Sequence, residues 1–115
     1  ELAGEGIRVN CVAVESIPTP NVVKVRPQGR WTQPERADEL LAESYKMYIP
    51  LQRPGRVDEV SNCVLFLASD LSAYVTGTTV HADGGACASG GWTNWPDDGF
   101  LPRPGPATME RLFRT

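Results

Sequence analysis

The chain has 115 residues and a net charge of −3, with 41% hydrophobic and 22% charged residues. That length permits one small domain, and the composition is that of an ordinary globular protein. The scattered Lys and Arg side chains exclude a basic nucleic-acid-binding surface, and no apolar run approaches the roughly 20 residues that a membrane-spanning helix needs. We therefore expect neither nucleic acid nor a membrane among its partners.

The N-terminal segment predicts a helix end followed by a strand. In residues 1–6, Gly4 and Gly6 can adopt the left-handed conformation that ends a helix. The stretch Ile7–Val14 is apolar except at Arg8 and Asn10, as is typical of a strand buried on both faces of a parallel sheet. Prolines and a glycine in residues 16–30 then predict a loop.

A helix is predicted after this loop. Its start is a capping box, Thr32-Gln33-Pro34-Glu35, in which the Thr32 and Glu35 side chains each accept the other residue's backbone N–H. The following apolar residues fall mostly on one helical face: Ala37, Leu40, Leu41, Tyr45 and Tyr48. Ile49-Pro50 ends the helix, because the residue before a proline is pushed out of the α region.

A second helix, from Val57 to Ala68, has acidic residues in its first turn, where they interact favourably with the helix dipole. It is apolar around most of its girth, so we expect it to be buried on more than one side. The β-branched stretch Thr78–Ala82 predicts a second strand. Strand, helices and strand form a βαβ-type unit, which is right-handed in nearly all proteins. Two parallel strands cannot cover both of their faces, so the unit implies a wider sheet.

The chain after Gly85 has a different character. Residues 86–115 contain four prolines, several glycines and the aromatics Trp92, Trp95 and Phe100, without periodicity until Met109–Phe113. An irregular tail that packs by its aromatic side chains is predicted, ending in a short helical turn. The division of the chain is thus residues 1–85, an α/β unit, and residues 86–115, the tail.

The three cysteines are Cys11, Cys63 and Cys87, an odd number without a Cys-x-x-Cys pair. Cys11 and Cys63 lie in apolar segments and are predicted to be buried thiols in a reducing compartment, the cytoplasm. The single histidine, His81, lies in the second strand and has neither a second histidine nor a paired cysteine nearby in the sequence. We therefore predict no metal site.

Spaced motifs in residues 1–85 resemble the C-terminal part of the short-chain dehydrogenase/reductase family. The motifs are Glu1-Leu2-Ala3 with Gly6–Asn10, Pro50-Leu51-x-Arg53-x-Gly55 with Asp58-Glu59-Val60, Phe66–Asp70 with Tyr74–Gly77, and Asp83-Gly84-Gly85. The resemblance implies the last two strands of a Rossmann-type doubly wound parallel sheet, with their crossover helices. It also implies a parent enzyme that transfers a hydride between NAD or NADP and an alcohol or carbonyl substrate.

The resemblance places the cofactor-side loop directly after the first strand. In the family this segment reads Asn-x-Val-x-Pro-Gly-x-Ile-x-Thr, so Ile17 and Thr19 would face the carboxamide and the diphosphate of the cofactor. Val14 and Glu15 replace the Pro-Gly pair. A carboxylate repels a diphosphate, and glycine allows a closer backbone approach. Alternatively, Glu15 turns to solvent and the loop takes another path.

The family's other functional residues find no match in this sequence. The dinucleotide-binding glycines would lie in the first βα turn of the fold, and the tyrosines Tyr45, Tyr48 and Tyr74 are followed four residues later by Ile49, Gln52 and Thr78 rather than by a lysine. We therefore expect these 115 residues alone to be inactive and to be the C-terminal fragment of such an enzyme. The resemblance further implies a homodimer or homotetramer, with the helix after Asp58 and the last strand at the subunit interface. The alternative is a non-catalytic truncated or degenerate paralogue that acts only as an association module.

Three further features have simple structural interpretations, and a fourth has two. Residues 84–91 could suggest a phosphate loop, but no helix start follows them, so we interpret them as a flexible turn. Asp97-Asp98 is interpreted as a solvated loop. The family pattern makes Arg53 an ion-pair residue. For Trp92 and Trp95 two readings stay open, a cover over the substrate pocket or a surface tail.

Overall fold

The computed structural model describes residues 1–20 and 34–114. A 3-10 helix, η1 (Leu2–Glu5), ends at Gly6, whose φ of 73° is in the left-handed region, as the sequence predicts. The chain then runs into strand β1 (Cys11–Val14), which pairs in parallel with strand β2 (Thr79–Ala82), with Cys11 opposite Thr79 and Val14 opposite Ala82. The strand predicted from Ile7 therefore joins the ladder only from Cys11 on.

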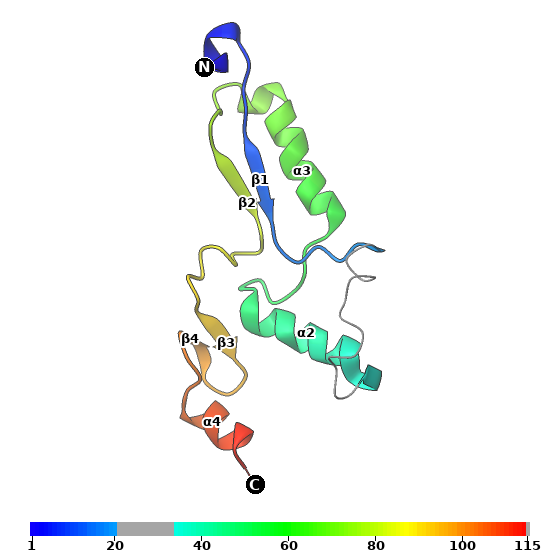
Figure 1. The fold of residues 1–115 in the computed structure, drawn as a ribbon, viewed down its shortest axis with the longest axis vertical. Helices are drawn as coiled ribbons and strands as arrows, with labels where there is room; N and C mark the ends of the chain where they lie inside the picture. Colours follow the sequence, from blue (N-terminus) through cyan, green and yellow to red (C-terminus); the bar gives the residue numbers. More distant parts are fainter. Residues whose placement is uncertain (21–33, 115) are drawn as a thin grey trace.

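Two helices connect the strands (Figure 1). Helix α2 (Ala37–Tyr48) follows a 3-10 turn, η2 (Pro34–Arg36), and ends where predicted, with Ile49 in the extended conformation that precedes proline. Helix α3 (Val57–Ala68) has the predicted bounds and packs on both strands. Most of the predicted loop of residues 16–30 lies outside the described residues, and so does Thr32 of the predicted capping box.

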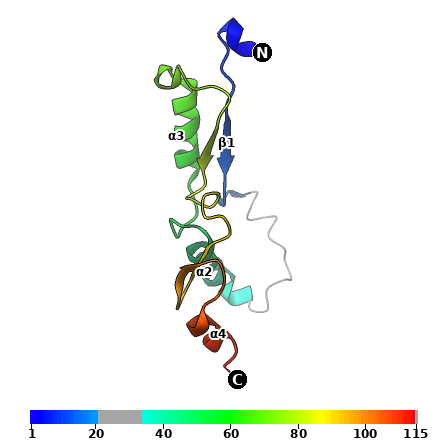
Figure 2. The same ribbon diagram turned by 90° about the vertical axis from the view of Figure 1, so that its left-hand side faces the viewer.

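Helix α3 covers one face of the β1–β2 pair (Figure 2). The prediction that this helix is buried on more than one side is wrong for the described residues: Val64 and Phe66 are exposed, and Leu65 retains 67% of its accessible surface. The predicted burial of the thiols is wrong as well, because Cys11 is exposed and Cys63 half-buried. Both errors have one cause: among the described residues the pair offers α3 a single apolar face to cover, whereas the sequence pattern suits a wider sheet.

The tail is more regular than predicted. Strands β3 (Thr93–Trp95) and β4 (Gly99–Leu101) form an antiparallel hairpin, and helix α4 (Pro106–Leu112) follows. The three-residue strands are too short to give a periodic pattern, and the connection depends on Gly99 with φ 77°. The predicted turn of residues 109–113 lies at the end of α4, whose first residue is a proline, as is common in helices.

Long-range contacts hold the tail together. The Asp98 carboxylate accepts the backbone N–H groups of Ala107 and Thr108, and Asp97 forms an ion pair with Arg111 at 3.0 Å. The interpretation of Asp97-Asp98 as a solvated loop holds for Asp97, which is exposed in a turn, but is wrong for Asp98, whose half-buried carboxylate binds the start of α4. The Asn94 amide donates to the Lys46 carbonyl at 3.3 Å, which places the hairpin against the end of α2.

The molecule is elongated, with extents of 66 × 31 × 21 Å and its termini at opposite ends of the long axis (Figure 1). Its radius of gyration of 18.7 Å exceeds the roughly 13 Å of a compact 100-residue domain. Ile49, 1% exposed, is the one fully buried hydrophobic side chain among the described residues. None of the helices in the described part of the chain has the length and apolar character to cross a membrane.

Candidate functional site

The segments that carry the family motifs contact one another at the two ends of the β1–β2 ladder. At the start of β1, the Arg8 guanidinium donates to the carbonyls of Leu67 and Val75, at 2.7 and 2.9 Å. The Asn10 amide donates to Val75 and accepts the N–H of Thr78. Arg8 and Asn10 thus bind the last turn of α3 and the approach to β2, which is a structural role.

The opposite end of the pair, where both strands finish, borders a cavity of about 550 Å³. Parallel strands present their carboxyl ends at the same edge of a sheet, and in open α/β folds this edge binds ligands. The side chains of Glu15 and Ile17, from the loop after β1, line the cavity together with His81 and Asp83 at the end of β2. This cavity is the candidate site.

One wall of the cavity consists of the Asp83-Gly84-Gly85 turn packed against the segment Ile49–Leu51. The N–H of Leu51 donates to the Gly84 carbonyl at 3.1 Å. Gly84 has φ +64°, and a Cβ added there would lie 2.6 Å from Cγ2 of Ile49. A side chain at this position would clash with the buried core residue, so the close approach requires glycine.

The Asp83 carboxylate fixes the turn from inside. Its oxygens accept the backbone N–H groups of Cys87 and Gly85, both at 2.9 Å. These hydrogen bonds, that of Cys87 foremost, hold the pKa of Asp83 below its ordinary value, although burial acts in the opposite direction. His81 Nδ1 lies 3.7 Å from Asp83 Oδ2.

Two of the four residues predicted to bind the cofactor line the cavity, and two do not. Glu15 and Ile17 line the cavity, and Ile17 packs tightly against Gly55. Val14, the last residue of β1, is exposed, and neither it nor Thr19 is a lining residue. Of the two paths that the sequence left open for Glu15, the half-buried position at the cavity is the one observed.

Two hydroxyl groups near Glu15 were not found by sequence reasoning. The Ser16 hydroxyl donates to the Glu15 carboxylate at 2.9 Å and lies 3.3 Å from the hydroxyl of Tyr48, at the end of α2. Burial, followed by the hydrogen bond with Glu15, raises the pKa of Tyr48. Ser16 has φ 45°, a conformation that is rare for a residue with a side chain and that occurs preferentially at functional sites. The sequence does not signal the contact between Ser16 and Tyr48, because these two residues are 32 positions apart.

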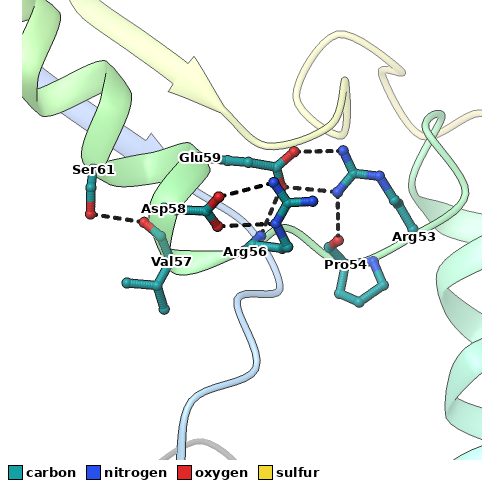
Figure 3. Close-up of polar contacts among 7 residues, drawn as sticks. All are labelled: Arg53, Pro54, Arg56, Val57, Asp58, Glu59 and Ser61. Atoms are coloured by element: carbon teal, nitrogen blue, oxygen red, sulfur yellow. Dashed lines mark hydrogen bonds and ion pairs between the residues drawn. The ribbon is translucent and has the colours of Figure 1, made fainter.

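Arg53 and Glu59, which both line the cavity, form a two-pronged ion pair (Figure 3), with N–O distances of 2.9 and 2.6 Å. Glu59 also accepts the backbone N–H of Arg56, the residue that precedes α3, at 2.9 Å. Hydrogen bonds from Arg53 and then from Arg56 lower the pKa of Glu59 to about 2. The prediction that Arg53 is an ion-pair residue is confirmed. The Arg56 guanidinium binds Asp58 in the same way, so neither arginine presents a vacant anion site.

Comparisons with known proteins agree with this geometry. A family model described as enoyl-(acyl carrier protein) reductase matches residues 1–87. The 3-oxoacyl-(acyl-carrier-protein) reductase FabG of Thermotoga maritima is 46% identical over 85 residues, which cover 74% of this chain and 30% of that protein. The chain spans about a third of the length of the curated relatives it matches.

Two solved structures resemble the fold. A C-terminal deletion mutant of aldohexose dehydrogenase from Thermoplasma acidophilum matches with a TM-score of 0.61 and 34% identity, over 70% of this chain and 35% of the other. An NADPH-bound short chain oxidoreductase from Pseudomonas aeruginosa, described as containing an atypical catalytic center, matches with a TM-score of 0.57 and 34% identity, over 73% of this chain and 30% of the other. The motifs, the parallel β1–β2 unit and these matches together show that the chain belongs to the short-chain dehydrogenase/reductase family.

Proposed function

We propose that this chain is the C-terminal part of an NAD(P)-dependent short-chain oxidoreductase that transfers a hydride between the nicotinamide and an alcohol or carbonyl substrate. The observation that carries the proposal is the cavity at the carboxyl ends of β1 and β2, lined by Glu15 and Ile17 from the loop that the family uses for its cofactor. The NADPH bound to the Pseudomonas aeruginosa relative supports the choice of cofactor.

Within this proposal the loop after β1 contributes to the cofactor site. Following the family resemblance, the Ile17 backbone faces the carboxamide and the Thr19 hydroxyl the diphosphate, with Val14 and Glu15 at the position of the family's Pro-Gly pair. Glu15 brings a carboxylate to the cavity, and its charge opposes that of the diphosphate. NAD(P) binding is therefore weaker than in a relative with glycine at this position.

The test is cofactor titration of the native protein that contains this sequence, as wild type and with Glu15→Gln. The substitution removes the charge and keeps the shape, so we expect the Kd for NAD(P)H, measured by fluorescence, to fall by about threefold to tenfold, or about 0.7–1.4 kcal/mol. Glu5→Gln, in η1 at the far end of the molecule, is the control and should leave the Kd unchanged. An unchanged Kd in the Glu15 variant would remove this residue from the cofactor site.

The fragment alone lacks a match for the catalytic serine, tyrosine and lysine of the family. Tyr48 lies near the cavity with Ser16, but the residue four positions later is Gln52. We propose that residues 1–115 alone have no oxidoreductase activity and that the missing groups belong to a longer parent chain. Measurable NAD(P)-dependent turnover by the purified 115-residue chain would contradict this.

Assembly, location and domain division complete the proposal. The exposed apolar residues of α3, Val64, Leu65 and Phe66, support a homodimer or homotetramer in which this helix and β2 are covered.

We place the boundary between the α/β unit and the tail at residue 85, and we place the protein in the cytoplasm. The Trp92 and Phe100 rings lie in a tilted arrangement with centroids 5.7 Å apart, and the Trp95 indole N–H donates to the Leu101 carbonyl. These contacts within the tail are compatible with either reading of the tryptophans, a pocket cover or a surface tail.

A second candidate function is a non-catalytic association module. It is favoured by the carboxylate of Glu15 at the cofactor-side cavity together with the exposed apolar surface of α3. The same titration separates the two candidates. An oxidoreductase binds NAD(P)H and gains affinity when the charge at Glu15 is removed, whereas an association module forms oligomers without binding the cofactor.

A further inference from the structure

We propose that His81, Asp83 and Cys87 form a binding site for a transition-metal ion of the zinc class. Each of the three side chains offers one ligand atom, and these atoms all lie within 4.8 Å of one another. The three residues span the end of β2 and the turn that follows it, with a spacing of His-x-Asp-x-x-x-Cys. The argument for this site does not rest on the nicotinamide chemistry proposed above.

The distances approach those of a tetrahedral site. Zinc bonds of about 2.0–2.3 Å place two ligand atoms of one ion roughly 3.3–3.8 Å apart. His81 Nδ1 and Asp83 Oδ2 are already 3.7 Å apart. Because no two ligand atoms are more than 4.8 Å apart, bringing the Cys87 sulfur into the same range needs a movement of at most about 1 Å, which side-chain rotation can supply because Cys87 and His81 are both exposed.

The backbone holds the central ligand in place. The Asp83 carboxylate, only 9% exposed, accepts the N–H groups of Gly85 and Cys87, which fix its orientation as outer-shell partners do in metal sites. Gly84 and Gly85, both with positive φ, turn the chain so that Cys87 returns towards His81. The position of His81 is fixed by its place in β2, where it pairs with Ala13 of β1.

The donor set selects the class of metal. Imidazole nitrogen, thiolate sulfur and carboxylate oxygen together suit zinc and its neighbours, whereas calcium and magnesium require mainly oxygen ligands. Three protein ligands leave a fourth position for water or another small ligand. His81 and Asp83 also line the cavity, so the proposed metal site borders the candidate site.

The test uses the native protein that contains this sequence, reduced and stripped with a chelator, and titrated with Zn²⁺ by calorimetry and with Co²⁺ by absorption spectroscopy. The variants His81→Ala and Cys87→Ser change exposed side chains, so the fold should persist, and circular dichroism verifies it. Cys11→Ser, at another exposed thiol, is the matched control. Asp83 is left intact because it also holds the turn.

We expect one Zn²⁺ per chain, a loss of affinity of at least about tenfold in each of the two variants, and unchanged affinity in the control. Bound Co²⁺ should give a thiolate charge-transfer absorption that persists with Cys11→Ser and disappears with Cys87→Ser. The absence of stoichiometric Zn²⁺ binding by the wild type would overturn the proposal. Wild-type affinity in either His81→Ala or Cys87→Ser would also overturn it.

Discussion

Glu59 joins two segments of the chain through one carboxylate. Its oxygens bind the Arg53 guanidinium and also accept the N–H of Arg56, so the start of α3 is tied to the segment that borders the cavity (Figure 3). Both contacts are stronger with the ionised carboxylate, and together they lower the pKa of Glu59 from 4.5 to about 2. This residue therefore makes the stability of the fold sensitive to acid.

We predict that Glu59→Gln lowers the melting temperature at neutral pH by a few degrees. The folded pKa of Glu59 is depressed, so its contribution is fully present above about pH 4.5 and is lost as the pH falls towards about 2. The melting temperatures of wild type and variant should therefore converge over this window in thermal denaturation followed by circular dichroism. Glu110→Gln, an exposed carboxylate on α4, is the control. A difference that stays constant down to pH 2 would contradict the assignment.

Single residues also show where sequence reasoning succeeds. The partnership of Arg53 could be anticipated, because its acidic partner lies six positions away in the first turn of the next helix. The contacts of Arg8 could not, because its guanidinium binds backbone carbonyls 59 and 67 positions along the chain. The cluster proposed to bind a metal could not be predicted for another reason. Its three residues contain neither a second histidine nor a cysteine pair, and the structure places a carboxylate between one histidine and one cysteine.

At the scale of elements, α3 and its neighbouring strands could be predicted because their patterns are long and consistent. The bounds of α3 and the end of α2 at Ile49 match the prediction, since apolar periodicity and a following proline are local signals. The hairpin of the tail could not be predicted, because its strands have three residues each and its stability depends on contacts with α2 and α4.

The Asp83-Gly84-Gly85 turn gives a prediction at this scale. Gly84→Ala should destabilise the fold by about 2–4 kcal/mol, through a strained positive φ and a clash with Ile49. Gly90→Ala is a matched control, because Gly90 has φ +58° and nothing within 4 Å of its added Cβ. Gly90→Ala should lower the free energy of unfolding only through the strained positive φ, by about 1–2 kcal/mol. Urea denaturation measures both, and equal losses would show that the close packing at Gly84 contributes nothing.

At the scale of the whole molecule, apolar side chains remain on the surface of an elongated chain. Leu65 and Phe66 project from α3, and Tyr74 just beyond it is fully exposed. Large apolar side chains left exposed in this way support a contact with further protein. The sequence pattern of a strand buried on both faces gives the same indication. Sequence and structure therefore both indicate that further protein covers this part of the fold. The sequence indicates it by the apolar pattern of the strand, and the structure by the exposed side chains of α3.

The exposed surface of α3 leads to a prediction about assembly. Leu65→Lys in the native protein should weaken self-association at least tenfold, measured as the dimer dissociation constant by analytical ultracentrifugation, because it places a charge in the proposed interface. The melting temperature of the dissociated subunit should stay within about a degree, since Leu65 is exposed in the described fold. Ser61→Lys, also exposed and one turn earlier on α3, tests how far the interface extends. Unchanged association in both variants would place the subunit contact elsewhere.

The most direct test of the central claim is the intact mass of the native protein together with the sequence of its N-terminal portion. The proposed oxidoreductase requires residues before Glu1 that contain a glycine-rich turn after the first strand and a Tyr-x-x-x-Lys motif, and a chain about three times the length of this sequence. That result would place the cavity at the ends of β1 and β2 inside a complete nucleotide-binding fold. A native chain with the mass of these 115 residues would contradict the oxidoreductase and leave the association module as its function.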